Sequence, residues 1–249
     1  MRRIKKKVRS VIRSFGFDLV PSYLCPEGHK LVDFRREAGF SQIADEIKGH
    51  RRTRLDYNRL FVLWQAVNNT FRFGHAAAEI GSYKGGSARF IASAFAQKGQ
   101  YLPIHVFDTF EGHPDFITPT LDGPHTKGDF SDTSYEAVKE YLSSFHNIQI
   151  HPGAFEDTCA QVADTSFSLV HIDVDIYRST VNCLEFFWPR LCDGGIIVVD
   201  DYGFVTCQGA KQAVDTFINR ISHCQTWYMQ TGQFVIQKYL REIRTREEG

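Results

Sequence analysis

Five short apolar runs recur along the chain from residue 75 onward. They cover residues 75–81 (HAAAEIG), 104–110 (IHVFDTF), 147–153 (NIQIHPG), 167–174 (FSLVHIDV) and 194–201 (GGIIVVDD). Runs of this length, rich in β-branched and aromatic residues, are typical of buried strands. The stretches between them have helical apolar spacing or at least helical length. Alternation of strands and helices predicts a parallel sheet covered on both faces.

Two further runs, residues 224–231 (CQTWYMQT) and 233–239 (QFVIQKY), follow a predicted helix at about 207–222. Thr231, at the end of the first run, and Gly232, which follows it, suit a tight turn, so these runs should form an antiparallel hairpin. The sequence therefore predicts an α/β fold. Its sheet is doubly wound and Rossmann-like, with seven strands: five parallel ones and a C-terminal antiparallel hairpin.

The same patterning divides the chain into regions. Residues 1–70 read as an N-terminal helical segment or cap, in which 55–67 has the spacing of a packed helix. Residues 71–240 form the main domain, and 241–249 a charged tail. Within the domain, residues 111–134 are rich in Pro, Gly and Asp and lack any apolar period. A loop this long in a compact domain is usually functional, and we expect a lid.

Composition adds one asymmetry. The net charge is zero, yet seven of the 29 Lys and Arg lie in residues 1–13, which hold no acid. We favour a solvated first helix docked on the body over an arm that contacts an anionic membrane surface, and a membrane contact stays open. The sequence shows no apolar run of membrane-spanning length and no secretory signal. We expect a cytoplasmic protein whose six scattered cysteines are reduced and mostly buried.

A glycine-rich stretch, EIGSYKGGS (79–87), follows the first predicted strand. It matches neither a dinucleotide fingerprint nor a P-loop. Gly81 permits a tight turn, Gly85 lets a ligand approach the backbone, and Ser87 begins a helix whose N-terminus favours a carboxylate. Asp108, at the tip of the second strand, can accept hydrogen bonds from ribose hydroxyls, or can simply cap a loop. S-adenosylmethionine carries both a carboxylate and an adenosine.

Acidic residues end the fourth and fifth strands. Asp173, Asp200 and Asp201 should converge at the carboxyl edge of the sheet, where ligands bind in such folds. Three clustered carboxylates favour a hard divalent cation such as Mg²⁺, although adjacent aspartates can also merely cap loops. We expect Asp175 to orient the following loop through Tyr177 and Arg178.

Histidines give less information. His171 shares a strand face with Asp173 but lies deeper, so we interpret it as a core histidine. His113 and His125 fall in the predicted lid, where they could reach a substrate or lie in solvent. We assign neither a role.

These motifs together resemble the class I S-adenosylmethionine-dependent methyltransferases, and more closely the macrocin O-methyltransferase (TylF/MycF-type) family. The resemblance covers about residues 55–236. It rests on EIGSYKGGS, FDTFEGHPD, GDFSDT, HPGAFEDT, HIDVDIYRST and GGIIVVDDYG…GAKQAVDTF. HIDVDIYRST is similar to the family's DGDLYEST segment, with valine in place of the usual glycine. The resemblance implies the class I methyltransferase fold.

The resemblance also implies site roles. The methionine end of the cofactor would be held by Glu79, Gly81, Tyr83 and Ser87, and the ribose by Asp108. Ala154 and Phe155 would flank the adenine, with Glu156 or a backbone group at its edge. Asp173, Asp200 and Asp201 would bind Mg²⁺, and Asp173 would also lie at the cofactor and help to activate the acceptor hydroxyl. Catechol-type enzymes resemble this layout too, but Ile176 stands where they carry a lysine.

We therefore expect a Mg²⁺-dependent O-methyltransferase acting on a sugar hydroxyl of a natural-product glycoside, nucleotide sugar or surface polysaccharide. Alternatives are a catechol or phenol O-methyltransferase, and a cofactor-binding protein without turnover. Nucleic acid is not an expected partner, because no Asn/Asp-Pro-Pro-Tyr/Phe motif follows the fourth strand. The resemblance implies a homo-oligomer paired through the N-terminal helices.

Overall fold

The computed structural model of the chain describes Val11 and residues 34–239. The chain divides into two units, Met1–Phe34 and Arg35–Gly249, and the second holds all the helices and strands described below except Phe34, the first residue of η2. The predicted docked helix at the basic N-terminus and the charged tail lie outside the described residues.

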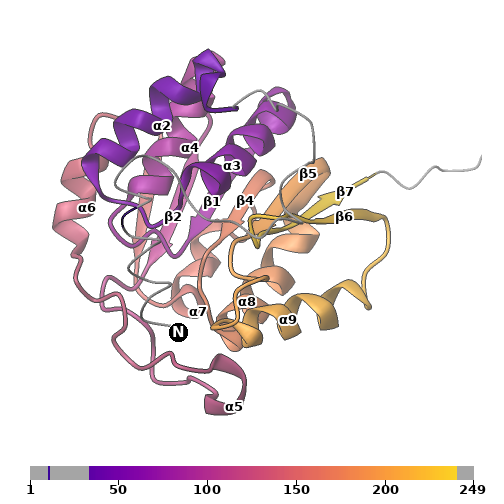
Figure 1. The fold of residues 1–249 in the computed structure, drawn as a ribbon. Helices are drawn as coiled ribbons and strands as arrows, with labels where there is room; N and C mark the ends of the chain where they lie inside the picture. Colours follow the sequence, from indigo (N-terminus) through magenta and orange to yellow (C-terminus); the bar gives the residue numbers. More distant parts are fainter. Residues whose placement is uncertain (1–10, 12–33, 240–249) are drawn as a thin grey trace, which may run out of the picture. The chain divides into compact units, whose positions relative to one another are not determined.

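A seven-stranded sheet runs through the second unit in the order β3-β2-β1-β4-β5-β7-β6 (Figure 1). Strands β1 to β5 are parallel, and β7 pairs antiparallel with both β5 and β6. The predicted five parallel strands and C-terminal hairpin are confirmed. The strands are β1 (Ala76–Ile80), β2 (Ile104–Asp108), β3 (Ile148–Pro152), β4 (Phe167–Ile172), β5 (Leu191–Val199), β6 (Cys224–Tyr228) and β7 (Phe234–Lys238).

Helices cover both faces of this sheet (Figure 1). On one face lie α2 (Ala38–His50), α3 (Tyr57–Thr70), α4 (Gly86–Gln97) and α6 (Tyr135–Leu142); on the other lie α7 (Phe155–Thr158), α8 (Tyr177–Phe187) and α9 (Gln208–Ile218). Short 3-10 turns are η2 (Phe34–Arg36), η3 (Phe71–Phe73), η4 (Cys159–Val162) and η5 (Trp188–Arg190). The predicted helices at 55–67 and 207–222 correspond to α3 and α9, and α9 ends at Ile218.

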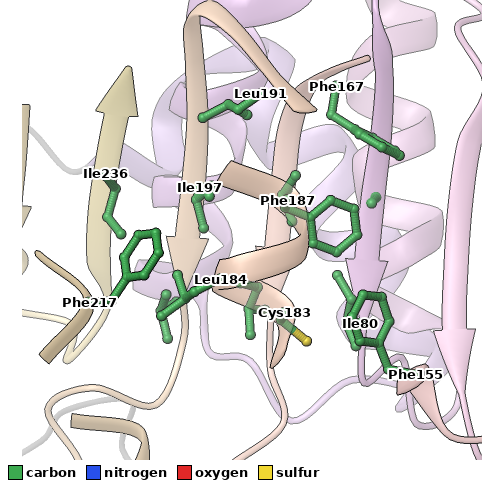
Figure 2. Close-up of a cluster of buried hydrophobic side chains, with 14 of the residues drawn as sticks. Ile80, Phe155, Phe167, Cys183, Leu184, Phe187, Leu191, Ile197, Phe217 and Ile236 are labelled. Atoms are coloured by element: carbon green, nitrogen blue, oxygen red, sulfur yellow. The ribbon is translucent and has the colours of Figure 1, made fainter. Parts of the chain in front are cut away.

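Aromatic and aliphatic side chains together fill the core between the sheet and α7–α8 (Figure 2). Phe187 of α8 stacks on Phe155, with ring centroids 5.4 Å apart, and meets Phe167 of β4 edge-on at 5.0 Å. Each buried phenylalanine contributes about 1.5–3 kcal/mol by leaving water. This packing positions the loops that follow β3 and β4 relative to the sheet, and these loops carry predicted site residues.

The backbone ladder continues past the strand ends at the carboxyl edge of the sheet. Gly81 donates its N–H to Phe107 O (2.9 Å), Asp173 to Ile80 O (2.9 Å) and Asp200 to Ile172 O (2.8 Å). The residues immediately after β1, β4 and β5 are therefore held side by side. This juxtaposition is what the sequence predicted for the acidic strand ends.

The predicted lid at 111–134 is an ordered excursion containing the short helix α5 (Pro119–Asp122). Its two arms pair through backbone hydrogen bonds between His113 and Asp129 and between Gly128 and His113. Asp122 is fully buried and accepts the backbone N–H groups of Thr118 and Tyr177, each at 2.7 Å. The hydrogen bond from Tyr177 ties the lid to the first turn of α8.

None of the helices in the described part of the chain combines the length and apolarity needed to span a bilayer. Of the described cysteines, Cys183 and Cys207 are buried, while Cys159, Cys192 and Cys224 are partly exposed; all five are free thiols. The prediction of reduced cysteines holds for these five, although fewer are fully buried than expected.

Candidate functional site

The glycine loop joins β1 to α4 and folds tightly for a steric reason. Gly81 has φ of +84°, and a Cβ there would lie 1.8 Å from the carbonyl oxygen of Asp173. Only glycine allows this contact between the ends of β1 and β4. Gly85 also has positive φ, but its Cβ would meet Val138 of α6 at 3.0 Å. Gly85 therefore serves helix packing rather than ligand approach, contrary to the expectation from sequence.

Asp108 at the end of β2 organises the same loop. Its two carboxylate oxygens accept the backbone N–H groups of Tyr83 and Phe110, each at 2.7 Å. Burial raises the pKa of Asp108, and these backbone hydrogen bonds act in the opposite direction. The loop-capping alternative is thus fulfilled, and because each oxygen has a second lone pair, ribose hydroxyls could still be bound.

A cavity of about 510 Å³ opens beside the loop. Most of the predicted cofactor residues line it: Gly81, Tyr83, Ser87, Asp108, Ala154, Phe155, Glu156 and Asp173. Glu79 is not among the lining residues. It is fully buried within β1, with Oε1 3.0 Å from Nδ1 of His171. Any effect of Glu79 on a ligand therefore passes through its neighbours.

The three predicted metal ligands converge, with carboxylate oxygens of Asp173, Asp200 and Asp201 all within 4.8 Å of one another. Asp173 and Asp201 line the cavity. Among the described residues, no protein donor lies within hydrogen-bond distance of the Asp173 carboxylate, while Asp201 accepts the Asp175 N–H at 2.9 Å. Burial, and then the neighbouring carboxylates, raise the pKa of Asp173 and Asp201 well above the ordinary value.

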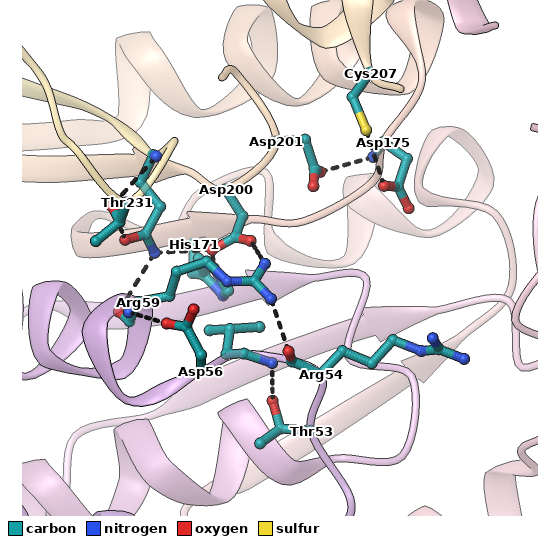
Figure 3. A network of polar contacts seen from close by, with 12 residues as sticks. Thr53, Arg54, Asp56, Arg59, His171, Asp175, Asp200, Asp201, Cys207 and Thr231 are labelled. Atoms are coloured by element: carbon teal, nitrogen blue, oxygen red, sulfur yellow. Dashed lines mark hydrogen bonds and ion pairs between the residues drawn. The ribbon is translucent and has the colours of Figure 1, made fainter. Parts of the chain in front are cut away.

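Asp200 lies in a different environment: it does not line the cavity and belongs to a network of polar contacts with Arg59 and His171 (Figure 3). It is fully buried, binds the guanidinium of Arg59, and accepts from Gln233 Nε2 at 2.8 Å. Burial favours the neutral acid, but the contact with His171 and the charge of Arg59 outweigh it and lower the pKa of Asp200. Asp200 is thus a carboxylate already paired with protein cations.

His171 completes this buried network. Its Nδ1 is hydrogen-bonded to Glu79 Oε1 at 3.0 Å, and its Nε2 lies 3.5 Å from Asp200 Oδ1 without hydrogen-bond geometry. Burial alone would lower the pKa of His171, but Asp200 and Glu79 together raise it to about 10. The two carboxylates thus favour the protonated imidazole, and the complete burial of the side chain agrees with its interpretation as a core histidine.

The comparisons with known proteins agree with this geometry. A family model described as macrocin-O-methyltransferase (TylF) matches residues 49–226. The chain belongs to this family. The sheet order and helix layers are those of the class I methyltransferase fold, which the O-methyltransferase NovP shares at a TM-score of 0.62 and 22% identity, over 76% of this chain and 83% of that one.

Two curated relatives are each 26% identical to this chain over the matched residues. One is 8-demethyl-8-(2,3-dimethoxy-alpha-L-rhamnosyl)-tetracenomycin-C 4'-O-methyltransferase of Streptomyces olivaceus, matched over 142 residues, or 53% of this chain and 54% of that protein. The other is mycinamicin III 3''-O-methyltransferase of Micromonospora griseorubida, matched over 174 residues, or 64% of this chain and 68% of that protein. The first match thus spans about half of its relative's length.

In this member of the macrocin O-methyltransferase family, two site residues escaped prediction. Arg59 belongs to α3 and reaches Asp200 from outside the sheet, and nothing in its local sequence marks it. Asp122, not Asp175, orients the start of α8 through Tyr177. Asp175 instead has φ of +60° and lines the cavity. In the sequence, Asp122 is marked only by its position before Gly-Pro in a long loop.

Proposed function

We propose that this protein is an S-adenosylmethionine-dependent O-methyltransferase that requires a divalent cation, Mg²⁺ in the first instance, and acts on a sugar hydroxyl. The observation that carries the proposal is the meeting of the glycine loop, Asp108 and the acids Asp173 and Asp201 around one cavity. Support comes from the names of the relatives, which are O-methyltransferases of natural products, one of them rhamnosylated.

The cavity suits the cofactor in size and in polar groups. Its volume lies within the range of about 300–1,000 Å³ that is usual for small-ligand sites. Ser87, in the first turn of α4, and Tyr83, in the loop before it, would hold the methionine carboxylate. Asp108 would accept the ribose hydroxyls. Ala154 and Phe155 would flank the adenine, with Glu156 at its edge.

The acids fit a hard cation, with one change to the set expected from sequence. Asp173 has no protein donor within the described residues and faces the cavity, and Asp201 lies beside it. Carboxylates held together in this way favour Mg²⁺. Asp200 is engaged by Arg59, so we assign it the part of a supporting charge and give the ligand role to Asp173 and Asp201.

The bound cation would orient the acceptor hydroxyl and lower its pKa. Asp173, which lines the cavity, would take the hydroxyl proton. As the new C–O bond forms, the S–CH₃ bond of the sulfonium breaks and neutral S-adenosylhomocysteine leaves. The Arg59 and His171 cations keep Asp200 ionised, so the proton is not shared with it. The remaining contribution is positioning by the cavity walls.

The wall of the cavity mixes apolar and polar residues. Phe116, Phe130 and Phe204 line it together with Arg54 and Thr206. A sugar ring needs such polar partners, whereas a catechol would suit aromatic walls alone. This mixture and Ile176 in place of lysine favour a sugar over a small phenol. The source of the sugar, whether glycoside, nucleotide sugar or polysaccharide, is an outcome of the screen below.

The test is a methyl-transfer assay with labelled cofactor on glycosides, nucleotide sugars and catechols, with Mg²⁺ or with EDTA. Asp173→Ala should abolish turnover while S-adenosylhomocysteine binding is largely retained. Asp164→Ala, at an exposed position, is the matched control and should keep wild-type turnover. Weakened cofactor binding with intact turnover at saturating cofactor would contradict the role of Asp173. Cofactor binding without turnover on any acceptor would favour the non-catalytic alternative.

A further inference from the structure

A second group of side chains with metal-binding chemistry lies where the lid meets the start of α9. Two of them belong to the lid, His113 before α5 and His125 after it. Asp175 lies in the loop after β4, and Cys207 immediately precedes α9. Ligand atoms of His113, His125 and Asp175 lie within 4.8 Å of one another. Cys207 is buried beside them, with Sγ 3.3 Å from Asp175 Oδ1 and 3.5 Å from His125 Nε2 (Figure 3 shows the Cys207–Asp175 contact).

One atom of this group lacks a partner. Nε2 of His113 is buried and, within the described part of the chain, makes no hydrogen bond. Its side chain is only 9% exposed, and Nε2 lies 3.4 Å from Asp175 Oδ2 without the alignment of a hydrogen bond. A buried ring nitrogen without a partner carries a desolvation cost, so its position calls for an explanation.

We propose that His113, His125, Asp175 and Cys207 form a zinc site. Zn²⁺ takes imidazole nitrogen, thiolate sulfur and carboxylate oxygen in tetrahedral geometry. Bond lengths of about 2.0 Å to nitrogen or oxygen and about 2.3 Å to sulfur set neighbouring ligand atoms about 3.3–3.5 Å apart. Three of the contacts are close to this spacing: His113 Nε2 to Asp175 Oδ2 (3.4 Å), His125 Nε2 to Cys207 Sγ (3.5 Å) and Cys207 Sγ to Asp175 Oδ1 (3.3 Å). The first and third involve different oxygens of Asp175, so binding of the metal would require a small rotation of that carboxylate. The orphaned Nε2 of His113 would become a ligand.

This site is separate in chemistry from the acids of the proposed Mg²⁺ site. Asp173 and Asp201 offer only oxygen, which suits hard cations, whereas two imidazoles and a thiolate select a softer transition metal. The two groups are neighbours, because Asp201 accepts the backbone N–H of Asp175. Because their ligand atoms differ in chemistry, metal binding at one group can be distinguished from binding at the other by the choice of metal.

The zinc would join three segments that are far apart in the sequence. It would fix the lid against the β4–α8 loop and the start of α9, at a wall of the cavity that includes His113, Asp175 and Cys207. Asp122 already anchors the lid to α8 by a hydrogen bond. The expected role is to hold the substrate-side wall in place.

The experiment uses the full-length protein, stripped with chelator and titrated with Co²⁺ as a spectroscopic probe and with Zn²⁺ in competition. We expect one equivalent of Co²⁺ to give intense tetrahedral bands and a thiolate charge-transfer band. Zn²⁺ should remove these bands, and a large excess of Mg²⁺ should not. His125→Gln and Cys207→Ser should each weaken Zn²⁺ binding at least 10-fold, and Cys207→Ser should lose the thiolate band.

Matched controls are His146→Gln and Cys192→Ser, whose side chains lie outside the group and should leave both bands and affinity unchanged. Circular dichroism of each variant checks folding. The Co²⁺ spectrum of the wild-type protein tests the proposal even if a variant fails to fold. The proposal is overturned by Co²⁺ bands that lack thiolate character, by displacement with Mg²⁺, or by Zn²⁺ affinity that His125→Gln and Cys207→Ser leave unchanged. None of these readouts depends on methyl transfer.

Discussion

The guanidinium of Arg59 binds the carboxylate of Asp200 across 141 positions of sequence. Arg59 lies in the first turn of α3, where the Asp56 side chain accepts its backbone N–H at 3.0 Å and caps the helix. Its second terminal nitrogen donates to Arg54 O at 2.7 Å. The pair joins a helix on one face of the sheet to the acidic edge that carries the proposed metal ligands.

Replacement of Arg59 by alanine should be costly, because it removes a cation that binds the fully buried carboxylate of Asp200. Loss of one partner of a buried pair costs about 3–5 kcal/mol. We expect Arg59→Ala to lower the free energy of unfolding by about that amount in urea denaturation. Arg220→Ala, which breaks the exposed pair with Glu185, should cost less than about 1 kcal/mol. Equal small losses in both variants would mean that Asp200 finds other compensation.

Gly81→Ala tests the contact between the ends of β1 and β4. The added Cβ would clash with the Asp173 carbonyl in a backbone conformation that alanine also disfavours, so we expect loss of folded protein or of cofactor binding. Gly99→Ala is the control, since Gly99 has φ of +68° with nothing within 4 Å of its Cβ position. That variant should lose only about 1 kcal/mol. Thermal melts of similar midpoint for the two variants would refute the steric argument.

His105 predicts a specific loss of stability in acid. Its Nδ1 lies 3.0 Å from Nε2 of His151, and burial together with the charge of that neighbour lowers the pKa of His105 to about 4, against 6.5 when unfolded. The unfolded chain therefore binds a proton that the folded chain resists. Stability should fall as the pH drops from about 6.5 to about 4 and then stop responding to this group.

The measurement is urea denaturation of the metal-free protein across that pH range, for wild type and His105→Gln. The variant should have a shallower pH dependence between pH 6.5 and 4. His146→Gln, which removes an exposed histidine, should follow the wild-type curve. A wild-type slope that His105→Gln leaves intact would assign the effect to other groups.

The five parallel strands and helices such as α3 and α9 could be predicted from the sequence, because the buried strands are short apolar runs and these helices repeat their apolar residues. The start of β5, at Leu191 and not at residue 194, and the short helix α5 within the lid were missed. The meeting of Asp173 and Asp201 followed too, since parallel strand ends share one edge. The pairing of Arg59 with Asp200 did not, because it depends on how α3 packs over the sheet. The same holds for Gly85, whose conformational freedom serves contact with α6 rather than with a ligand.

The lid illustrates a second limit. Its lack of period identified residues 111–134 as unusual, but not the buried Asp122 or the approach of His125 to Cys207, which is 82 positions away. The sequence shows no zinc-like spacing because the ligands come from three separate segments. Only the folded chain brings them together.

Calorimetric titration of the full-length protein with S-adenosylhomocysteine, once with Mg²⁺ and once with EDTA, tests the central claim most directly. We predict one micromolar site per chain, strongly weakened in Asp108→Ala and unchanged in Asp164→Ala, with circular dichroism to show that both variants fold. Absence of binding under both conditions would contradict the proposed methyltransferase function and leave the cavity beside the glycine loop to a different ligand.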